Sequence, residues 1–439
     1  MYKLTHAWND MRASFWCVPF IILALSIALA FALTHLGESG VEQWFQHYPR
    51  LFGAGAAGAR EMLSTIAGSM ISVVGIVFSM TLVALALASS QYSPRVLSIF
   101  MRSRFTQAAL GIFTGIFVYC LIVLRGVQGE DDSTVVPVVA VTVALLLALV
   151  GVAVLILFVH HIAQSIQAPT ILANIADETI LAVESVFPAR RDAASTDGCL
   201  NDEAATALVQ QAHWSAVPAR KSGYVQSIDE EGLLRFACKR KVMVKMEYAI
   251  GHFVIAGTPI FSVSGVLEGG DASADALYTM IAVSDHRTIE QDPGFGLRQL
   301  VDVALKALSP GVNDTSTAIM CLDNLGAVLG VIARRKILSP YRFIAGELKV
   351  VSVTPDFAGL LAEAFDQIRR SAGGNVAIIL RMIGTIEMLG LLATDKEETL
   401  LIHLDLLDEL AARTIPAPHD AAMVSQRLVA VRKAIAARC

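Results

Sequence analysis

Five hydroxyl side chains recur at helical spacing in a stretch of the chain without a formal charge. Between Glu61 and Arg95 lie 33 residues, none of them acidic or basic. Steps of three and four residues return to the same side of an α-helix. Eight positions share one side, which we call the hydroxyl face: Thr65, Ser69, Ser72, Ile76, Ser79, Val83, Ala86 and Ser90. In an oligomer such a face could line a pore, with hydroxyl rings and with apolar constrictions at Ile76 and Val83.

Tight helix packing is the alternative use of this helix. Two small-xxx-small pairs lie along it, Gly68 with Ser72 and Gly75 with Ser79. Such pairs let the backbones of two membrane helices touch, and hydroxyl groups can donate to carbonyl oxygens of their own helix. The sequence does not decide whether this helix lines a water-filled pore or packs against another helix.

A second group of polar residues lies in the second half of the chain. Arg298 and Asp302 are four residues apart on a predicted helix, and Asn313 and Asp314 follow a Ser-Pro-Gly turn. In an active site, either aspartate would act as a general base or a metal ligand. The structural interpretation is an ion pair on a helix face and an N-cap at Asp314. We expect these residues, with Arg95, to serve a cytoplasmic contact or a gating role.

Several kinds of chemistry are not supported by the sequence. The predicted spans contain no ionisable residue in their interior, which argues against coupled transport. No Walker A loop, dinucleotide fingerprint or nucleophile–base arrangement is found. The six cysteines lack paired spacing. We therefore expect a protein that is not an enzyme and that has neither a cofactor nor a metal site.

Composition identifies an integral membrane protein. The chain is 55% hydrophobic and 17% charged, with a mean hydropathy of +0.59, which is too apolar for an ordinary soluble protein of 439 residues. Four transmembrane helices are predicted, at residues 15–33, 64–88, 108–124 and 135–158. The part after the spans is mildly acidic, so we expect no nucleic acid partner.

The charge distribution in the loops predicts the topology. Basic residues precede the first span and lie between the second and third, whereas an acidic loop at 130–132 separates the third from the fourth. Both termini are therefore predicted to be cytoplasmic. The first apolar run exceeds the usual length of a signal peptide core, so we expect it to be retained as an anchor.

The periodicity of the apolar residues predicts four parts of the chain. Residues 1–160 form the four-helix transmembrane domain, and 161–220 a linker helix and loop. Period-two alternation and glycine punctuation at 221–285 indicate a small β-barrel or sandwich module, in which 251–260 resembles the hairpin of lipoyl-type modules. Helical periodicity returns in 286–439, a predicted cytoplasmic helical bundle. The fold class is thus membrane α-helical with a cytoplasmic α+β region.

Two motifs resemble those of a known family. The sequence EQDPGFGLRQLVD at 290–302 continues to ALSPGVND at 307–314, and SSQYSPR occupies 89–95. Together they resemble the bacterial family of predicted membrane proteins catalogued as domain of unknown function 2254, over nearly the whole chain. Thr315 stands where that family's pattern has a proline, which concerns only the rigidity of a helix start. The resemblance implies a membrane topology and no activity.

These observations lead to one functional hypothesis and one alternative. We expect a multi-pass protein of the bacterial inner (plasma) membrane that assembles into a homo-oligomer within the lipid bilayer. The second span of each copy would line a passive pore for ions or small solutes. The alternative is a membrane-anchored signalling or scaffold protein with a ligand- or partner-sensing cytoplasmic domain.

Overall fold

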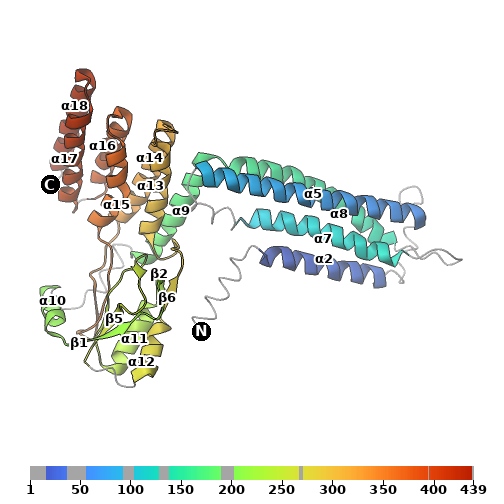
Figure 1. Ribbon diagram of the computed structural model, residues 1–439, viewed down its shortest axis with the longest axis horizontal. Helices are drawn as coiled ribbons and strands as arrows, with labels where there is room; N and C mark the ends of the chain where they lie inside the picture. Colours follow the sequence, from blue (N-terminus) through green and yellow to red (C-terminus); the bar gives the residue numbers. More distant parts are fainter. Residues whose placement is uncertain are drawn as a thin grey trace. The chain divides into compact units, whose positions relative to one another are not determined.

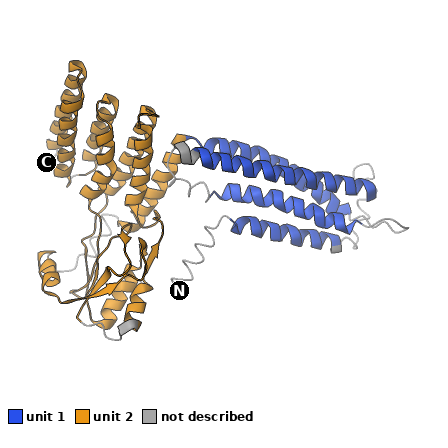
Figure 2. Ribbon diagram, in the orientation of Figure 1, with its two compact units in different colours: residues 1–167 blue, residues 168–439 orange. Residues whose placement is uncertain are grey.

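Two compact units make up the chain. The computed structural model describes residues 16–36, 56–91, 103–127, 138–188, 202–265, 270–393 and 395–437. Contacts divide the chain into unit 1, residues 1–167, and unit 2, residues 168–439, coloured blue and orange in Figure 2. Each unit is described by itself.

Unit 1 is built from long apolar helices. They are α2 (Cys17–Leu36), α5 (Ala56–Gln91), α7 (Arg104–Gly126) and α8 (Val138–Ser165), drawn in blue to green in Figure 1. In a bilayer, a helix satisfies all the backbone hydrogen bonds of a spanning segment. With 36 residues, α5 is roughly 54 Å long, more than the ~30 Å hydrocarbon core requires.

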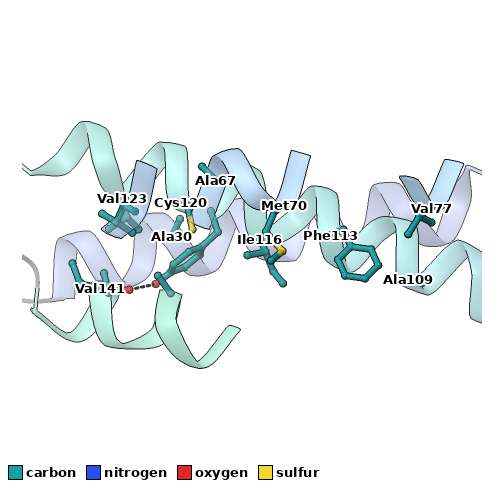
Figure 3. Packing of buried hydrophobic residues seen from close by; sticks show 14 of the residues in the cluster. Ala30, Ala67, Met70, Val77, Ala109, Phe113, Ile116, Cys120, Val123 and Val141 are labelled. Carbon is teal, nitrogen blue, oxygen red and sulfur yellow. Dashed lines mark hydrogen bonds between the residues drawn. The ribbon is translucent and has the colours of Figure 1, made fainter. Parts of the chain in front are cut away.

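The helix α7 forms the centre of unit 1. It contacts α2, α5 and α8, and half of it is buried. Figure 3 shows Phe113 and Ile116 of α7 packed beside Met70 of α5. Tyr119 is fully buried, and its hydroxyl donates to the Ala140 carbonyl of α8 at 2.9 Å. A glycine, Gly111, lets α7 approach α2 closely.

Within the described residues, five helices are long and apolar enough to cross a membrane. Four are those of unit 1, and they match the four predicted spans. The fifth, α14 (Thr315–Ala333), belongs to unit 2, where it contacts α9, α13 and α16. Its composition meets the requirement for a span while half of it is buried against protein. The chain is therefore a multi-pass membrane protein with four or five candidate spans.

Unit 2 combines helices with two sheets. Its elements in chain order are α9 (Ala168–Val186), α10 (Asp202–Gln211), β1 (Trp214–Pro218), β2 (Gly223–Ile228), α11 (Glu230–Arg240), β3 (Val244–Met246), β4 (Phe253–Val254), β5 (Pro259–Ser264), α12 (Gly270–Tyr278), β6 (Ile281–Ser284), α13 (Pro293–Ala307), α14, β7 (Tyr341–Ile344), β8 (Glu347–Val351), α15 (Phe357–Ser371), α16 (Val376–Gly390), α17 (Glu397–Thr414) and α18 (Pro418–Ala436). A layered helical bundle is formed by α13, α14, α15, α16, α17 and α18 (Figure 1).

The strands form two open sheets, whereas the sequence predicted a small β-barrel or sandwich. One is five-stranded and mixed, in the order β1-β5-β3-β8-β7, and the other is antiparallel, in the order β4-β2-β6. Their buried residues share one core, which includes Val225 and Phe261. A barrel requires its end strands to pair, and within the described residues β1 and β7 each have one neighbour. The predicted barrel is therefore not present in that part of the chain.

The predicted hairpin at 251–260 is also wrong. The two strands on either side of its turn join different sheets, because β4 pairs with β2 whereas β5 pairs with β1 and β3. The turn itself contains Gly257, whose φ is +89°, a conformation that glycine adopts without strain. The resemblance to a lipoyl-type hairpin was therefore misleading.

Candidate functional site

The hydroxyl face lies on the outside of unit 1. Seven of its eight positions, from Thr65 to Ala86, are exposed, with Ile76 at 55% and Val83 at 56%. The opposite side of α5 is buried in the unit 1 core, where Leu63 and Val77 are almost inaccessible. Ser90 belongs to α5, but its side chain lies outside the described residues. The seven described positions therefore share one exposed side of α5.

Hydroxyl groups on this face donate to their own helix. Thr65 donates to the Glu61 carbonyl and Ser69 to that of Thr65, both at 2.8 Å, and Ser72 donates to the Gly68 carbonyl at 2.9 Å. These bonds satisfy the hydroxyl protons locally. The oxygen lone pairs remain available as acceptors on the outer surface.

No helix of the described part of unit 1 covers Gly68 or Gly75 of α5. A Cβ added at Gly68 or at Gly75 would meet no atom within 4 Å. The glycines of α7 differ, because a Cβ at Gly111 would lie 2.9 Å from the Pro19 backbone of α2. Packing within unit 1 therefore accounts for Gly111 of α7 and does not account for Gly68 and Gly75 of α5.

The exposed faces of α2 and α8 have a different composition. They present large apolar side chains such as Leu25, Leu149 and Ile156, each more than 60% exposed. Such surfaces suit lipid chains. The exposed side of α5 also presents large apolar side chains such as Ile71, Phe78 and Leu82, but it adds to them the small and hydroxyl residues of the hydroxyl face.

Arg298 and Asp302 form an ion pair on α13. The Arg298 Nε lies 3.0 Å from Asp302 Oδ1, and its Nη1 lies 3.5 Å from Glu363 Oε1 on α15. All three side chains are partly buried. The Arg298–Asp302 pair therefore lies within α13, as an ion-pair interpretation predicts, and the longer Arg298–Glu363 contact joins α13 to α15.

Asp314 is the N-cap of α14. Its Oδ1 accepts from the Thr317 backbone N–H at 3.0 Å, and its Oδ2 accepts from the Thr317 hydroxyl. These hydrogen bonds favour the carboxylate and lower the pKa of Asp314 below its usual range. The preceding Asn313 has a φ of 49°, a left-handed turn that asparagine tolerates. The helix begins at Thr315 without the proline of the family pattern.

The predicted contact residues belong to different elements. Arg298 and Asp302 lie within α13, whereas Asn313 and Asp314 lie before α14. Arg95 lies outside the described residues. Within the described ranges, no group of three or more His, Cys, Asp and Glu residues is placed to hold a metal ion.

The family motif at 290–302 has a clear structural role. Asp292 is the N-cap of α13, accepts from the Phe295 N–H at 3.0 Å, and lies 2.8 Å from Arg287 Nη2. Burial raises the pKa of Asp292, against the opposing effect of Arg287. At Gly296, a Cβ would collide with the Thr179 side chain of α9. The motif therefore sets where α13 begins and how closely it packs.

One polar cluster in unit 1 was missed by the sequence analysis. The His161 Nε2 of α8 lies 3.2 Å from the Ser103 hydroxyl and 3.4 Å from that of Ser165. The His161 ring also packs against Phe105, with ring centroids 4.8 Å apart. His161 comes at the end of a predicted span, but its distance from Ser103 along the sequence concealed the contact.

Comparison with known proteins supports the resemblance drawn from the motifs. A family model described as "Predicted membrane protein (DUF2254)" matches residues 12–388. Two proteins described as uncharacterized, from Mycobacterium tuberculosis and Mycobacterium bovis, are each 30% identical over 426 residues, covering 94% of this chain and 79% of the relative. No solved structure matches the chain. Because the family model spans most of both units, this chain belongs to the DUF2254 family of predicted membrane proteins.

Proposed function

We propose that the protein forms a homo-oligomer in which α5 of each subunit surrounds a narrow passive pathway for ions or small solutes. The observation that carries the proposal is the exposure of the hydroxyl face along α5, opposite the buried core. The bacterial inner membrane is the proposed location, with both termini cytoplasmic. Unit 2 would assemble and gate the ring through the residues around Arg298 and Asp314.

The physical support for a pathway comes from what the hydroxyl face offers. Ser69, Ser72 and Ser79 would present rings of oxygen acceptors to water and cations, while Ile76 and Val83 would form apolar constrictions. Polar rings and dewetting constrictions are the elements from which channels are built. The described α5 carries no charge between Glu61 and its end, which fits passive flow better than coupled transport.

Recording from purified protein in planar bilayers tests conduction. We expect unitary currents from the unmodified chain, and we expect Ser72→Trp to reduce the unitary conductance at least about tenfold by filling the lumen. The matched control is Leu149→Trp on the 61% exposed surface of α8, which should leave conductance unchanged. A membrane that stays silent with correctly folded protein would contradict the proposal.

Accessibility of single cysteines separates a wet face from a dry seam between subunits. In a background with the six native cysteines replaced by alanine, Ser72→Cys and Ser79→Cys should react with a water-soluble, membrane-impermeant thiol reagent. Leu149→Cys, which would face lipid, should not react. Equal resistance at all three positions would show that water does not reach the hydroxyl face, which would contradict the pathway.

The alternative of a membrane-anchored signalling or scaffold protein makes a different prediction. Such a protein requires no continuous pathway, so a monomer or dimer with a silent membrane would favour it. A ligand of unit 2 would then be expected to change the exposure of unit 2 to proteolysis without any current.

A further inference from the structure

Unit 1 contains a cavity that the proposed pore does not use. The cavity has a volume of about 240 Å³, several times the ~30 Å³ share of one water molecule in the liquid. Val77 and Ala84 of α5 form one wall, and both are nearly inaccessible from outside. These residues lie on the side of α5 away from the hydroxyl face. The cavity and the proposed pore therefore use different sides of this helix.

One end of the cavity is polar and carries no formal charge. His161, Ser103, Ser165 and Thr106 line this end. The Thr106 hydroxyl donates to Ser103 at 3.2 Å, and the Ser103 and Ser165 hydroxyls lie near the His161 Nε2. Among the described residues that line the cavity, none is Asp, Glu, Lys or Arg. The cluster offers hydroxyl and imidazole groups that can donate to or accept from an uncharged head group.

The other end is apolar and reaches the exposed surface of α5. Phe78 and Leu82 line it and are 51% and 50% exposed on the outer surface of α5. A ligand can therefore enter sideways from the hydrocarbon of the bilayer. Lipid chains are as apolar as leucine, so the apolar wall alone does not favour one lipid over another. Hydrogen bonding at the polar end must supply the selectivity.

We propose that this cavity binds a neutral lipid of the surrounding bilayer, with a long apolar chain against Val77 and Leu82 and a hydroxyl or carbonyl head group on His161. The site combines an apolar wall at Val77, an opening beside Leu82 and a polar end at His161. Among the described lining residues an anionic head group would find no Lys or Arg, which is why we propose a neutral ligand class.

Photolabelling of the full chain in phosphatidylcholine nanodiscs tests the site. The probe is a long-chain primary alcohol with a diazirine in its chain, and labelled peptides are mapped by mass spectrometry. We expect labelling to concentrate in residues 77–85 and 161–165, and to be competed by unlabelled hexadecanol. A probe alkane without the hydroxyl should label these segments no more than the exposed face of α8.

Two substitutions with matched controls make the test specific. His161→Phe keeps the ring and removes the hydrogen-bonding nitrogens, so labelling by the alcohol should fall about five- to tenfold. His160→Phe, at the exposed neighbouring position that does not line the cavity, should leave labelling unchanged. Thr81→Trp should fill the cavity and reduce labelling at least about tenfold.

Thr142 provides the control for Thr81. Both are partly buried threonines whose hydroxyls donate to the carbonyl four residues earlier, but Thr142 does not line the cavity. Thr142→Trp should therefore retain labelling. If Thr81→Trp fails to fold, the comparison of labelling between His161→Phe and His160→Phe tests the site without it. Labelling spread evenly over the exposed leucines, or equal labelling by a fatty acid probe, would overturn the proposal.

Discussion

Asp314 and His403 illustrate how the fold changes the ionisation of single groups. Asp314 accepts two hydrogen bonds from Thr317, which hold its pKa below the usual range. His403 lies buried on α17 beside the Phe365 ring, and burial lowers its pKa. Asp366 opposes that shift and Arg369 adds to it. In both cases the folded chain favours the form present at neutral pH.

Replacing Asp314 by alanine should weaken the start of α14. The substitution leaves the Thr317 N–H without its side-chain acceptor, at a cost of about 1 kcal/mol. Thermal unfolding in detergent should show a lower midpoint for Asp314→Ala, while Asp314→Ser, which can still cap, should stay near the unmodified chain. Equal loss in both variants would contradict the capping role.

Acidification should destabilise unit 2 through His403. Its folded pKa lies below the usual 6.5, so below that pH the unfolded chain binds a proton that the folded chain does not. The contribution of His403 to the free energy of unfolding is fully present above the pKa that this residue has in the unfolded chain. It is lost as the pH falls toward the pKa of His403 in the folded chain, by at most about 1.4 kcal/mol per pH unit. Unfolding midpoints at about pH 7.5 and about pH 5.5 measure the loss.

Two histidine substitutions separate this effect from general acid sensitivity. His403→Phe removes the titrating group from an apolar site, so the difference between the two midpoints should shrink. His419→Phe changes an exposed residue of α18 and should leave the difference as it was. An unchanged difference in the His403 variant would show that other groups cause the acid sensitivity.

The packing of α14 on α16 depends on one small residue. A Cβ at Gly326 would lie 2.7 Å from the Thr385 Cγ2, which is closer than real side chains approach. Gly384, next to Thr385 in the sequence, has open space around it. The two glycines therefore serve different purposes, since only Gly326 is needed for close contact.

Gly326→Ala should destabilise unit 2 by roughly 1–3 kcal/mol through overpacking. Gly384→Ala should be neutral or stabilising, because alanine favours helices and meets no neighbour. Combining Gly326→Ala with Thr385→Ser, which removes the methyl group in conflict, should restore part of the loss. Chemical denaturation of the full chain in detergent gives the free energy of unfolding of each of the three variants. If Gly326→Ala leaves that free energy unchanged, the close contact between Gly326 and Thr385 is refuted.

Elements with strong local patterns were predictable, and those made by distant partners were not. The four spans emerged from charge-free runs, and α14 from its Asp314 cap. Strands β7 and β8 were missed because β8 pairs with β3, far away in the sequence. The expected hairpin failed for the same reason, since strand pairing is decided by tertiary contacts rather than by adjacency.

The candidate site was predictable in its spacing but not in its surroundings. Steps of three and four placed Ser69, Ser72 and Ser79 on one face, yet they could not indicate whether another helix covers that face. The exposed Gly68 and Gly75 supplied that answer. The cavity beside His161 was invisible in the sequence, because its lining comes from several helices.

Assembly of the whole chain is the property on which the proposed pathway depends. A lumen requires several copies related by rotational symmetry around one axis. Light scattering with subtraction of detergent should give a protein mass of at least about three times the 47.0 kDa subunit. A species of one subunit under conditions that preserve the fold would contradict the pore and favour the anchored alternative.

The parallel pairing of β3 with β8 has a consequence for biosynthesis. Val244 pairs with Val350, and α13 and α14 lie between these strands along the chain. While the ribosome is still translating those helices, β3 therefore has an open edge that can recruit strands from other nascent chains. Fragments that stop before residue 351 should aggregate during expression, whereas a fusion partner attached after the last helix should be tolerated.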